Sequence, residues 1–222
     1  GTPGATGEDD ERPARKIAMS AFWIDRTEVT AAQYRKCVVE RACSPAGTGP
    51  WCNSRKDGRD DHPINCVTWS AGDSYCKWAG GSLPSEAQWE KAARGPYGRL
   101  FPWGWFFLSC DKAVFNEWAR GHACGQNSTW AVGSKPAGTS PYGAVDMSGN
   151  VWEWVQDDYV AGFYARSPDR DPILDKKSVF GIMRGGGFGR DQWEGWRAAN
   201  RFKSAKMNQT EGTGFRCGMP DT

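Results

Sequence analysis

Long apolar runs are missing from this 222-residue sequence, and no run is long enough to cross a lipid bilayer. Clusters of lysine and arginine are also missing and the formal net charge is only +2, which makes nucleic acid and anionic membranes poor candidates as partners. Only two histidines are present and no two cysteines form a CxxC pair, which argues against a zinc site. We therefore expect neither membrane insertion nor nucleic-acid binding.

Tryptophan, glycine and cysteine are abundant instead. Thirteen Trp and 28 Gly are typical of a loop-rich fold in which indole rings fill irregular gaps. Eight cysteines, an even number, favour four disulfides and an oxidising compartment, so we expect an extracytoplasmic protein (periplasmic, cell-surface or secreted). Proximity along the chain suggests three pairs and leaves other pairings open: Cys37 with Cys43, Cys52 with Cys66, and Cys110 with Cys124.

One domain is expected over residues 16–222, after a flexible polar lead at residues 1–15. Residues 16–25 alternate apolar and polar side chains, as an edge strand does. Thr30 is placed to cap a helix that extends to about Glu40. The domain is therefore predicted to begin with a strand and a helix.

Two capping boxes predict two more helices. Ser70 with Asp73 opens a helix that stops at the glycines 80–81, and Ser85 with Gln88 opens one that ends near residue 95. Three later segments indicate strands, at 145–155 (a turn followed by a buried strand), 180–188 and 214–219. Residues 96–142 show no strong period and are expected to be a long loop.

A tight turn opens the first of these later segments. The carboxylates of Asp146 and Glu153 bracket it, and the carbonyls of Gly149 and Val151 can point in the same direction. This set contains only oxygen ligands, which suits a hard cation such as Ca²⁺. The turn is therefore a candidate metal site.

Seven segments, in order, resemble the formylglycine-generating enzyme (sulfatase-modifying factor) family. They are FWIDRTEVT at 22–30, HPINCVTW at 62–69, YCKWAG with LPSEAQWE at 75–90, FPWG at 101–104, GNVWEW at 149–154, RGGGF at 184–188 and GFRC at 214–217. The resemblance implies an α+β fold, the family's variant of the C-type-lectin fold, which is loop-rich and low in regular structure. It also implies a disulfide between Cys76 and Cys217, which completes a set of four.

The resemblance further implies one calcium ion. The family binds it at the positions that are here Asp146 and Glu153 (side chains) and Gly149 and Val151 (carbonyls). The alternative is that Asp146 caps the turn and Glu153 pairs with an arginine. The family's other calcium site is not matched well enough here for a second ion to be expected.

The family's catalysis uses copper held by two thiolates, ligands that suit a soft Cu(I) ion. Counting from the RGGGF segment, the two thiols would fall at Arg190 and Gly195, and the interval 189–202 contains no cysteine. We therefore expect no bound copper and no formylglycine chemistry.

The same interval is instead interpreted as a ligand-binding face. It combines aromatic and forked polar side chains, the types that often carry binding energy: Arg190, Asp191, Gln192, Trp193, Glu194 and Trp196, joined by Trp105 from the 103–107 loop. For Trp193 and Trp196, packing in the core is an equally good alternative.

The sequence thus predicts a non-catalytic, calcium-stabilised module of an extracytoplasmic bacterial protein. It would bind a peptide, a protein or a glycan through the 189–197 and 103–107 loops, and would be a monomer as an isolated domain. One alternative is a formylglycine-generating-type oxidase or another metal-dependent oxidoreductase. A second is a variable protein of a diversity-generating retroelement, a class that uses the same fold.

Overall fold

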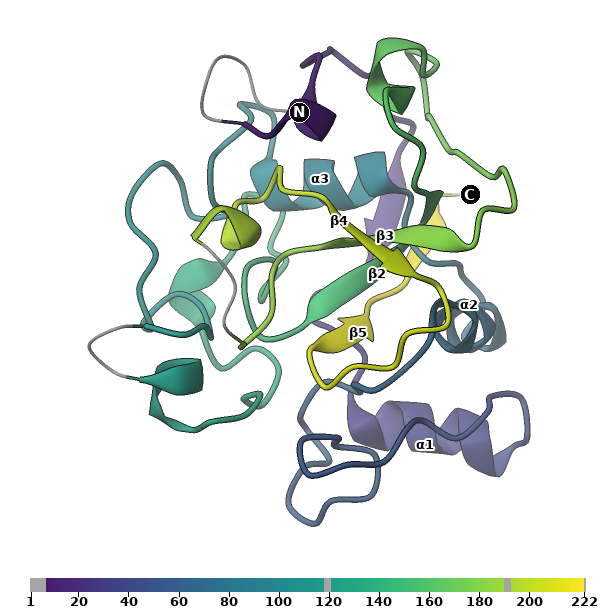
Figure 1. Ribbon diagram of the computed structural model, residues 1–222, viewed down its shortest axis with the longest axis vertical. Coiled ribbons are helices and arrows are strands. Elements are labelled where there is room, and N and C mark those ends of the chain that lie inside the picture. The colour runs from purple at the N-terminus through teal and green to yellow at the C-terminus, as the bar shows by residue number, and fades with distance from the viewer. Residues whose placement is uncertain (1–6, 118–120, 190–192, 222) are drawn as a thin grey trace.

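The fold consists of short helices and strands joined by long loops (Figure 1). The computed structural model describes residues 7–117, 121–189 and 193–221. The described α-helices are α1 (Ala31–Val39), α2 (Trp69–Trp78) and α3 (Glu86–Arg94). The described strands are β1 (Phe22–Ile24), β2 (Trp152–Asp158), β3 (Phe180–Arg184), β4 (Phe202–Ala205), β5 (Thr213–Phe215) and β6 (Gly218–Pro220). Single 3₁₀ turns lie at η1 (Asp9–Glu11), η2 (His122–Gly125), η3 (Pro136–Gly138), η4 (Phe163–Ala165) and η5 (Trp193–Trp196). The predicted loop-rich α+β fold is confirmed.

Two sheets organise the fold. The larger has the strand order β4-β3-β2-β5, in which β5 runs parallel to β2 and the other pairs are antiparallel. The smaller pairs β1 with β6, so that the first and last strands of the chain lie side by side. In Figure 1, α3 crosses the upper side of the larger sheet, whereas α1 and α2 lie below it and to its right.

The helices begin where side chains can satisfy their free N–H groups. The Thr30 hydroxyl accepts a hydrogen bond from Gln33 N at 3.2 Å, and the same arrangement of Ser85 and Gln88 opens α3 at 3.1 Å. For α2 the prediction was wrong, because the cap is Thr68, whose hydroxyl accepts from Ala71 N at 3.1 Å. The helix therefore begins one residue before Ser70.

The strands are shorter than the sequence patterns predict, because a strand extends only over the residues that pair with a neighbouring strand. Of residues 16–25, only 22–24 form a strand, where they lie opposite 218–220. The segment 214–219 is divided between two sheets: Phe215 pairs with β2, whereas Gly218 pairs with β1. The chain thus changes sheets within a few residues.

Four disulfides cross-link this framework: Cys37–Cys43, Cys52–Cys66, Cys76–Cys217 and Cys110–Cys124. They are the pairs that the sequence and the family resemblance predict, and no cysteine is left free. The Cys76–Cys217 bond ties α2 to the segment between β5 and β6. Four disulfides are typical of proteins that fold in oxidising compartments.

Part of the N-terminal lead, for which flexibility was predicted over residues 1–15, packs against the domain. Glu11 has no exposed surface, and both its carboxylate oxygens accept hydrogen bonds from Arg197 (2.6 and 3.1 Å). The carbonyl of Asp10 accepts from Arg201 at 2.9 Å. Residues 7–15 are held in this way because the two arginines are buried and need acidic or carbonyl partners; residues 1–6 lie outside the described part of the chain.

None of the described helices is both long enough and apolar enough to span a bilayer.

Candidate functional site

The turn at residues 146–150 is buried and its backbone is tightly constrained. Asp146 is 3% exposed and has a φ of 60°, and Gly149 has a φ of 87°. A Cβ atom on Gly149 would lie 2.4 Å from the carbonyl oxygen of Val114, so only glycine fits there. Hydrogen bonds from Gly149 N to Gly185 O and from Asn150 N to Val114 O, both 2.8 Å, fix the turn against its neighbours.

Glu153, at the start of β2, is fully buried and is paired with an arginine. It accepts hydrogen bonds from Arg216 Nε and Nη2, each at 2.7 Å, and from Trp89 Nε1 at 2.7 Å. Asp146 Oδ2 accepts from Gly133 N at 2.6 Å. Glu153 therefore has the arginine partner that the alternative interpretation expects, whereas the bond to Asp146 comes from Gly133, which lies outside the turn.

A third buried carboxylate, which the sequence did not single out, lies beside these two. Glu28 is 1% exposed; its Oε1 accepts from Asn150 Nδ2 at 3.0 Å, whereas its Oε2 has no hydrogen-bond partner. Burial and the charges of Asp146 and Glu153 hold the pKa of Glu28 well above its usual range. Burial also raises the pKa of Asp146. Three carboxylates thus surround the single guanidinium of Arg216.

This surplus of negative charge is compatible with a bound cation. A carboxylate has about four lone-pair sites, of which Glu153 uses three, so one remains for a metal. The described residues contain no group of three or more metal-binding side chains. A cation at this turn would therefore depend on the carbonyl oxygens of Gly149 and Val151 as well as on Asp146.

The predicted ligand-binding loops are only partly described. Arg190, Asp191 and Gln192 lie outside the described residues. Trp193 is 53% exposed, and the guanidinium of Arg197 lies 5.8 Å from its ring centroid. Glu194 is half-buried, with one carboxylate oxygen that has no hydrogen-bond partner. In the other loop, Trp105, Phe106 and Phe107 are 63, 73 and 88% exposed.

Trp196 lies in the core, unlike Trp193. It is 3% exposed, its Nε1 donates to Gly187 O at 2.8 Å, and its ring packs edge-on against Phe115. A ligand cannot reach this indole without moving the loop. Of the two alternatives for these residues, core packing therefore holds for Trp196 and exposure for Trp193.

One apolar cluster supports both loops. It contains Phe101, Cys110, Ala113, Phe115 and Trp196, with Leu100, Trp103, Leu108 and Cys124 packed against it. A hydrogen bond from Ala198 N to Leu100 O at 2.9 Å joins the two chain segments directly. The exposed rings at 105–107 and at Trp193 thus project from segments that share one apolar base.

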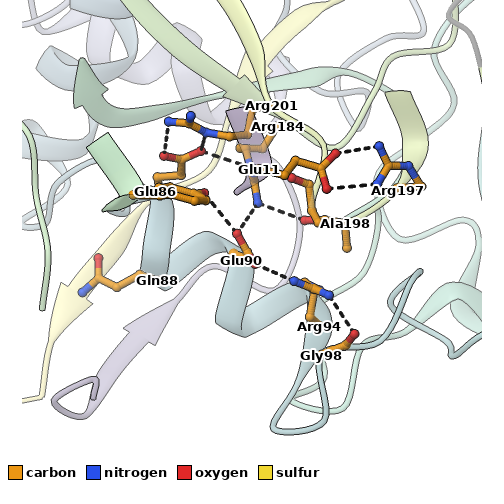
Figure 2. Close-up of polar contacts among 12 residues, drawn as sticks. Glu11, Glu86, Gln88, Glu90, Arg94, Gly98, Arg184, Arg197, Ala198 and Arg201 are labelled. Atoms are coloured by element: carbon orange, nitrogen blue, oxygen red, sulfur yellow. Dashed lines mark hydrogen bonds and ion pairs between the residues drawn. The ribbon is translucent and has the colours of Figure 1, made fainter. Parts of the chain in front are cut away.

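Figure 2 shows an arginine–glutamate network, made up of Glu86, Glu90, Arg94, Arg184 and Arg201. Arg201 donates to both oxygens of Glu86 at 2.7 and 2.9 Å. Arg184 donates to Glu86 at 3.2 Å and to Glu90 at 2.8 Å. The network fastens α3 to β3 and to the chain that follows η5, so it positions the base of the predicted ligand face.

Sequence reasoning missed this network, although the sequence carries a signal for it. Glu86 and Glu90 are spaced by four residues and so share one face of α3. Arginine recurs at 184, 190, 197 and 201. Buried arginines require acidic partners, and α3 together with the acidic N-terminal lead supplies them.

Comparison with known proteins agrees with this architecture. The family model described as "Sulfatase-modifying factor enzyme 1-like domain" matches residues 1–219. The formylglycine-generating enzyme of Streptomyces coelicolor is 30% identical over 258 aligned residues, which cover 94% of this chain and 81% of that protein.

Solved structures show the same fold. The structure of PvdO from Pseudomonas aeruginosa superposes with a TM-score of 0.80 at 25% identity, over 97% of this chain and 87% of that one. Treponema denticola variable protein 1 has a TM-score of 0.72 at 17% identity, over 91% and 86% of the two chains, which is a likeness of fold alone. Since the family model covers nearly the whole chain, the protein belongs to the sulfatase-modifying factor enzyme 1-like family, the family of the formylglycine-generating enzymes.

Proposed function

We propose that this domain is a non-catalytic, calcium-stabilised ligand-binding module of an extracytoplasmic bacterial protein. The observation that carries the proposal is the state of the cysteines: all eight are paired in disulfides. A copper site made of two thiolates needs two cysteines outside such bonds. The positions where the family resemblance places them are Arg190 and Gly195.

Metal content and free thiols test the loss of catalysis. The purified chain would be analysed for copper before and after loading with Cu(I), alongside a free-thiol count and an oxygen-consumption assay with a cysteine-containing peptide. We expect no retained copper, no free thiol and no peptide-dependent oxygen uptake. Stoichiometric copper or a reactive thiol pair would overturn the proposal.

Exposed aromatic rings support binding as the remaining role. Trp105 and Trp193 offer large apolar surfaces, and both lie on segments that share the apolar cluster beneath them. Rings held this way lose little conformational freedom on binding a peptide, a protein or a glycan.

Glycan arrays and displayed peptide libraries would be screened with the wild type and with Trp193→Ala. Trp23→Ala serves as the matched control, since Trp23 is 64% exposed on β1. A ligand whose binding survives Trp193→Ala, or is lost equally in the control, contradicts the assignment of this face.

The calcium ion is proposed at the turn, with Asp146 and Glu153 supplying side chains and Gly149 and Val151 supplying carbonyls. The unpartnered oxygen of Glu28 and its raised pKa support it, because a cation would offset the excess of carboxylates. We expect about one Ca²⁺ per chain by elemental analysis and a lower Tm in EGTA. Asp146→Ala should remove both effects, whereas Asp60→Ala, at a surface residue, should not. A Tm that is indifferent to EGTA would contradict the site.

A second candidate function is that of a formylglycine-generating-type oxidase or another metal-dependent oxidoreductase. The similarity to the enzyme of Streptomyces coelicolor over 94% of this chain favours it. The copper-loading experiment separates a formylglycine-generating-type oxidase from the binding module, because such an oxidase would retain copper and consume oxygen.

A further inference from the structure

A cavity of about 490 Å³ lies on the outer side of α3, between that helix, the N-terminal segment 13–19 and the loops at 95–105 and 163–172. Its volume is within the range of small-molecule sites, roughly 300–1,000 Å³. The described residues of the 189–202 interval do not line it. The cavity is thus separate from the position of the family's thiolates, and Trp105 is the residue that it shares with the ligand face proposed above.

Most of the cavity wall is apolar or aromatic. Ile17, Leu100 and Phe163 contribute buried or half-buried apolar surface. Tyr97 and Trp105, which are 81 and 63% exposed, add aromatic rings that are largely open to solvent. An apolar or aromatic ligand would cover these surfaces and remove them from water.

The acidic groups of the wall are already neutralised. Glu86 and Glu90 belong to the arginine–glutamate network and are paired with guanidinium groups. Asp157 accepts hydrogen bonds from the backbone N–H groups of Glu86 and Leu174 at 2.8 and 2.9 Å. Burial and the Glu86 carboxylate raise the pKa of Asp157 to about 7, so it carries only part of a charge at neutral pH.

The cationic groups of the wall are not all neutralised. Arg15 is occupied, since it pairs with Asp169 and donates to the carbonyls of Tyr164 and Ser167 at 2.7 Å. Within the described parts of the chain, neither Lys16 nor Lys91 has a carboxylate in ion-pair distance. Two ammonium groups therefore remain available beside an apolar wall.

We propose that this cavity binds a small aromatic carboxylic acid. Its ring lies against the apolar wall and the rings of Tyr97 and Trp105, and its carboxylate meets the ammonium groups of Lys91 and Lys16. Charge-assisted hydrogen bonds to a carboxylate are stronger than those between neutral groups. A neutral amide or an amine of the same shape is disfavoured, because the first lacks the charge and the second adds a like charge.

Three probes of matched shape test the charge preference on the whole chain by isothermal titration calorimetry: naphthalene-2-carboxylate, naphthalene-2-carboxamide and 2-naphthylmethylamine. We expect the carboxylate to bind about tenfold more tightly than the amide, and the amine to bind most weakly. Equal affinities for carboxylate and amine, or no binding of the carboxylate at millimolar concentration, would overturn the proposal.

Substitutions then locate the site. Lys91→Glu should reverse the order, so that the amine binds more tightly than the carboxylate, and Lys91→Met should bring carboxylate and amide close together. Ala87→Trp, which fills the cavity from α3, should abolish binding of all three probes without changing the Tm. Lys36→Glu is the control, since it changes an exposed lysine on α1. If Lys91→Glu and Lys36→Glu have the same effect, or if Ala87→Trp still binds the carboxylate, the ligand lies elsewhere.

Discussion

Among the described residues, two ion pairs have no exposed side-chain surface, and one of them joins Glu11 to Arg197. Removing one charge from such a pair leaves the other without compensation in the interior. Glu11→Gln should therefore lower the free energy of unfolding by about 3–5 kcal/mol, measured by urea denaturation. Asp9→Asn, at an exposed partner of Arg12, should change it by less than about 0.5 kcal/mol. Similar losses in the two variants would mean that the N-terminal lead is not held by this pair.

Asp157 gives a prediction about pH. Its pKa is raised by burial and by Glu86 to about 7, compared with about 3.9 for an unfolded aspartate, so the folded state favours the protonated acid. The contribution of Asp157 to stability is therefore complete below about pH 4 and is lost as the pH rises to about 7. The free energy of unfolding of the wild type, relative to Asp157→Asn, should fall over this interval by at most about 1.4 kcal/mol per pH unit. A difference that is constant with pH would show that the two backbone N–H bonds keep the carboxylate ionised.

The partners of single side chains were the least predictable part of the site. The sequence marks Asp146 and Glu153 as a pair at a turn, because they lie seven residues apart in one motif. Glu153 pairs with Arg216, and Glu28 lies beside Asp146. Both contacts depend on chain segments from the two ends of the domain. No local pattern carries that information.

At the scale of elements, substitutions at the start of α2 can distinguish the predicted N-cap, Ser70, from the observed one, Thr68. Thr68→Ala removes the hydroxyl that accepts from Ala71 N and should lower the free energy of unfolding by about 1 kcal/mol. Ser70→Ala, inside the helix, should have an effect below about 0.5 kcal/mol. The measurement is urea denaturation of both variants at one pH. The reverse order would restore Ser70 as the cap.

Helices were more predictable than strands for a physical reason. A cap is complete within four residues, so Thr30 with Gln33 and Ser85 with Gln88 could be read from the sequence. A strand ends where its partner ends, and the partner of β1 lies almost 200 residues away, at 218–220. Residues 16–21 have a strand pattern, but within the described part of the chain their pairing is limited to an isolated bridge between Ala18 and Arg170.

At the scale of the whole molecule, the disulfides differ mainly in the length of chain that they enclose. Cys76 and Cys217 are 141 residues apart, whereas Cys110 and Cys124 are 14 apart. If the bonds act by restricting the unfolded chain, replacing the first pair with alanine should lower the free energy of unfolding by about 2 kcal/mol more than replacing the second. Guanidinium denaturation of the two double variants measures this difference. Equal losses would indicate that local packing around each bond dominates.

The overall fold was predictable because seven motifs follow one another in the family's order, and together they fix the framework. The cavity beside α3 and the docking of the N-terminal lead were not predictable. Ile17, Phe163 and Trp105 line the same cavity, although they lie in separate segments with no common sequence pattern. A surface formed by several loops arises only when the chain has folded, so a local sequence pattern does not predict it.

The pairing of the two ends has a consequence for biosynthesis. The strand at 22–24 pairs with 218–220, Glu11 forms an ion pair with Arg197, and Cys76 forms a disulfide with Cys217. During synthesis or export in the N-to-C direction, these early segments therefore have no native partner until nearly all of the domain has emerged. Contacts of such long sequence separation also slow folding, to a scale of about milliseconds to seconds. A cell that makes this domain must keep an aromatic-rich, thiol-bearing chain from aggregating or forming wrong disulfides over that interval.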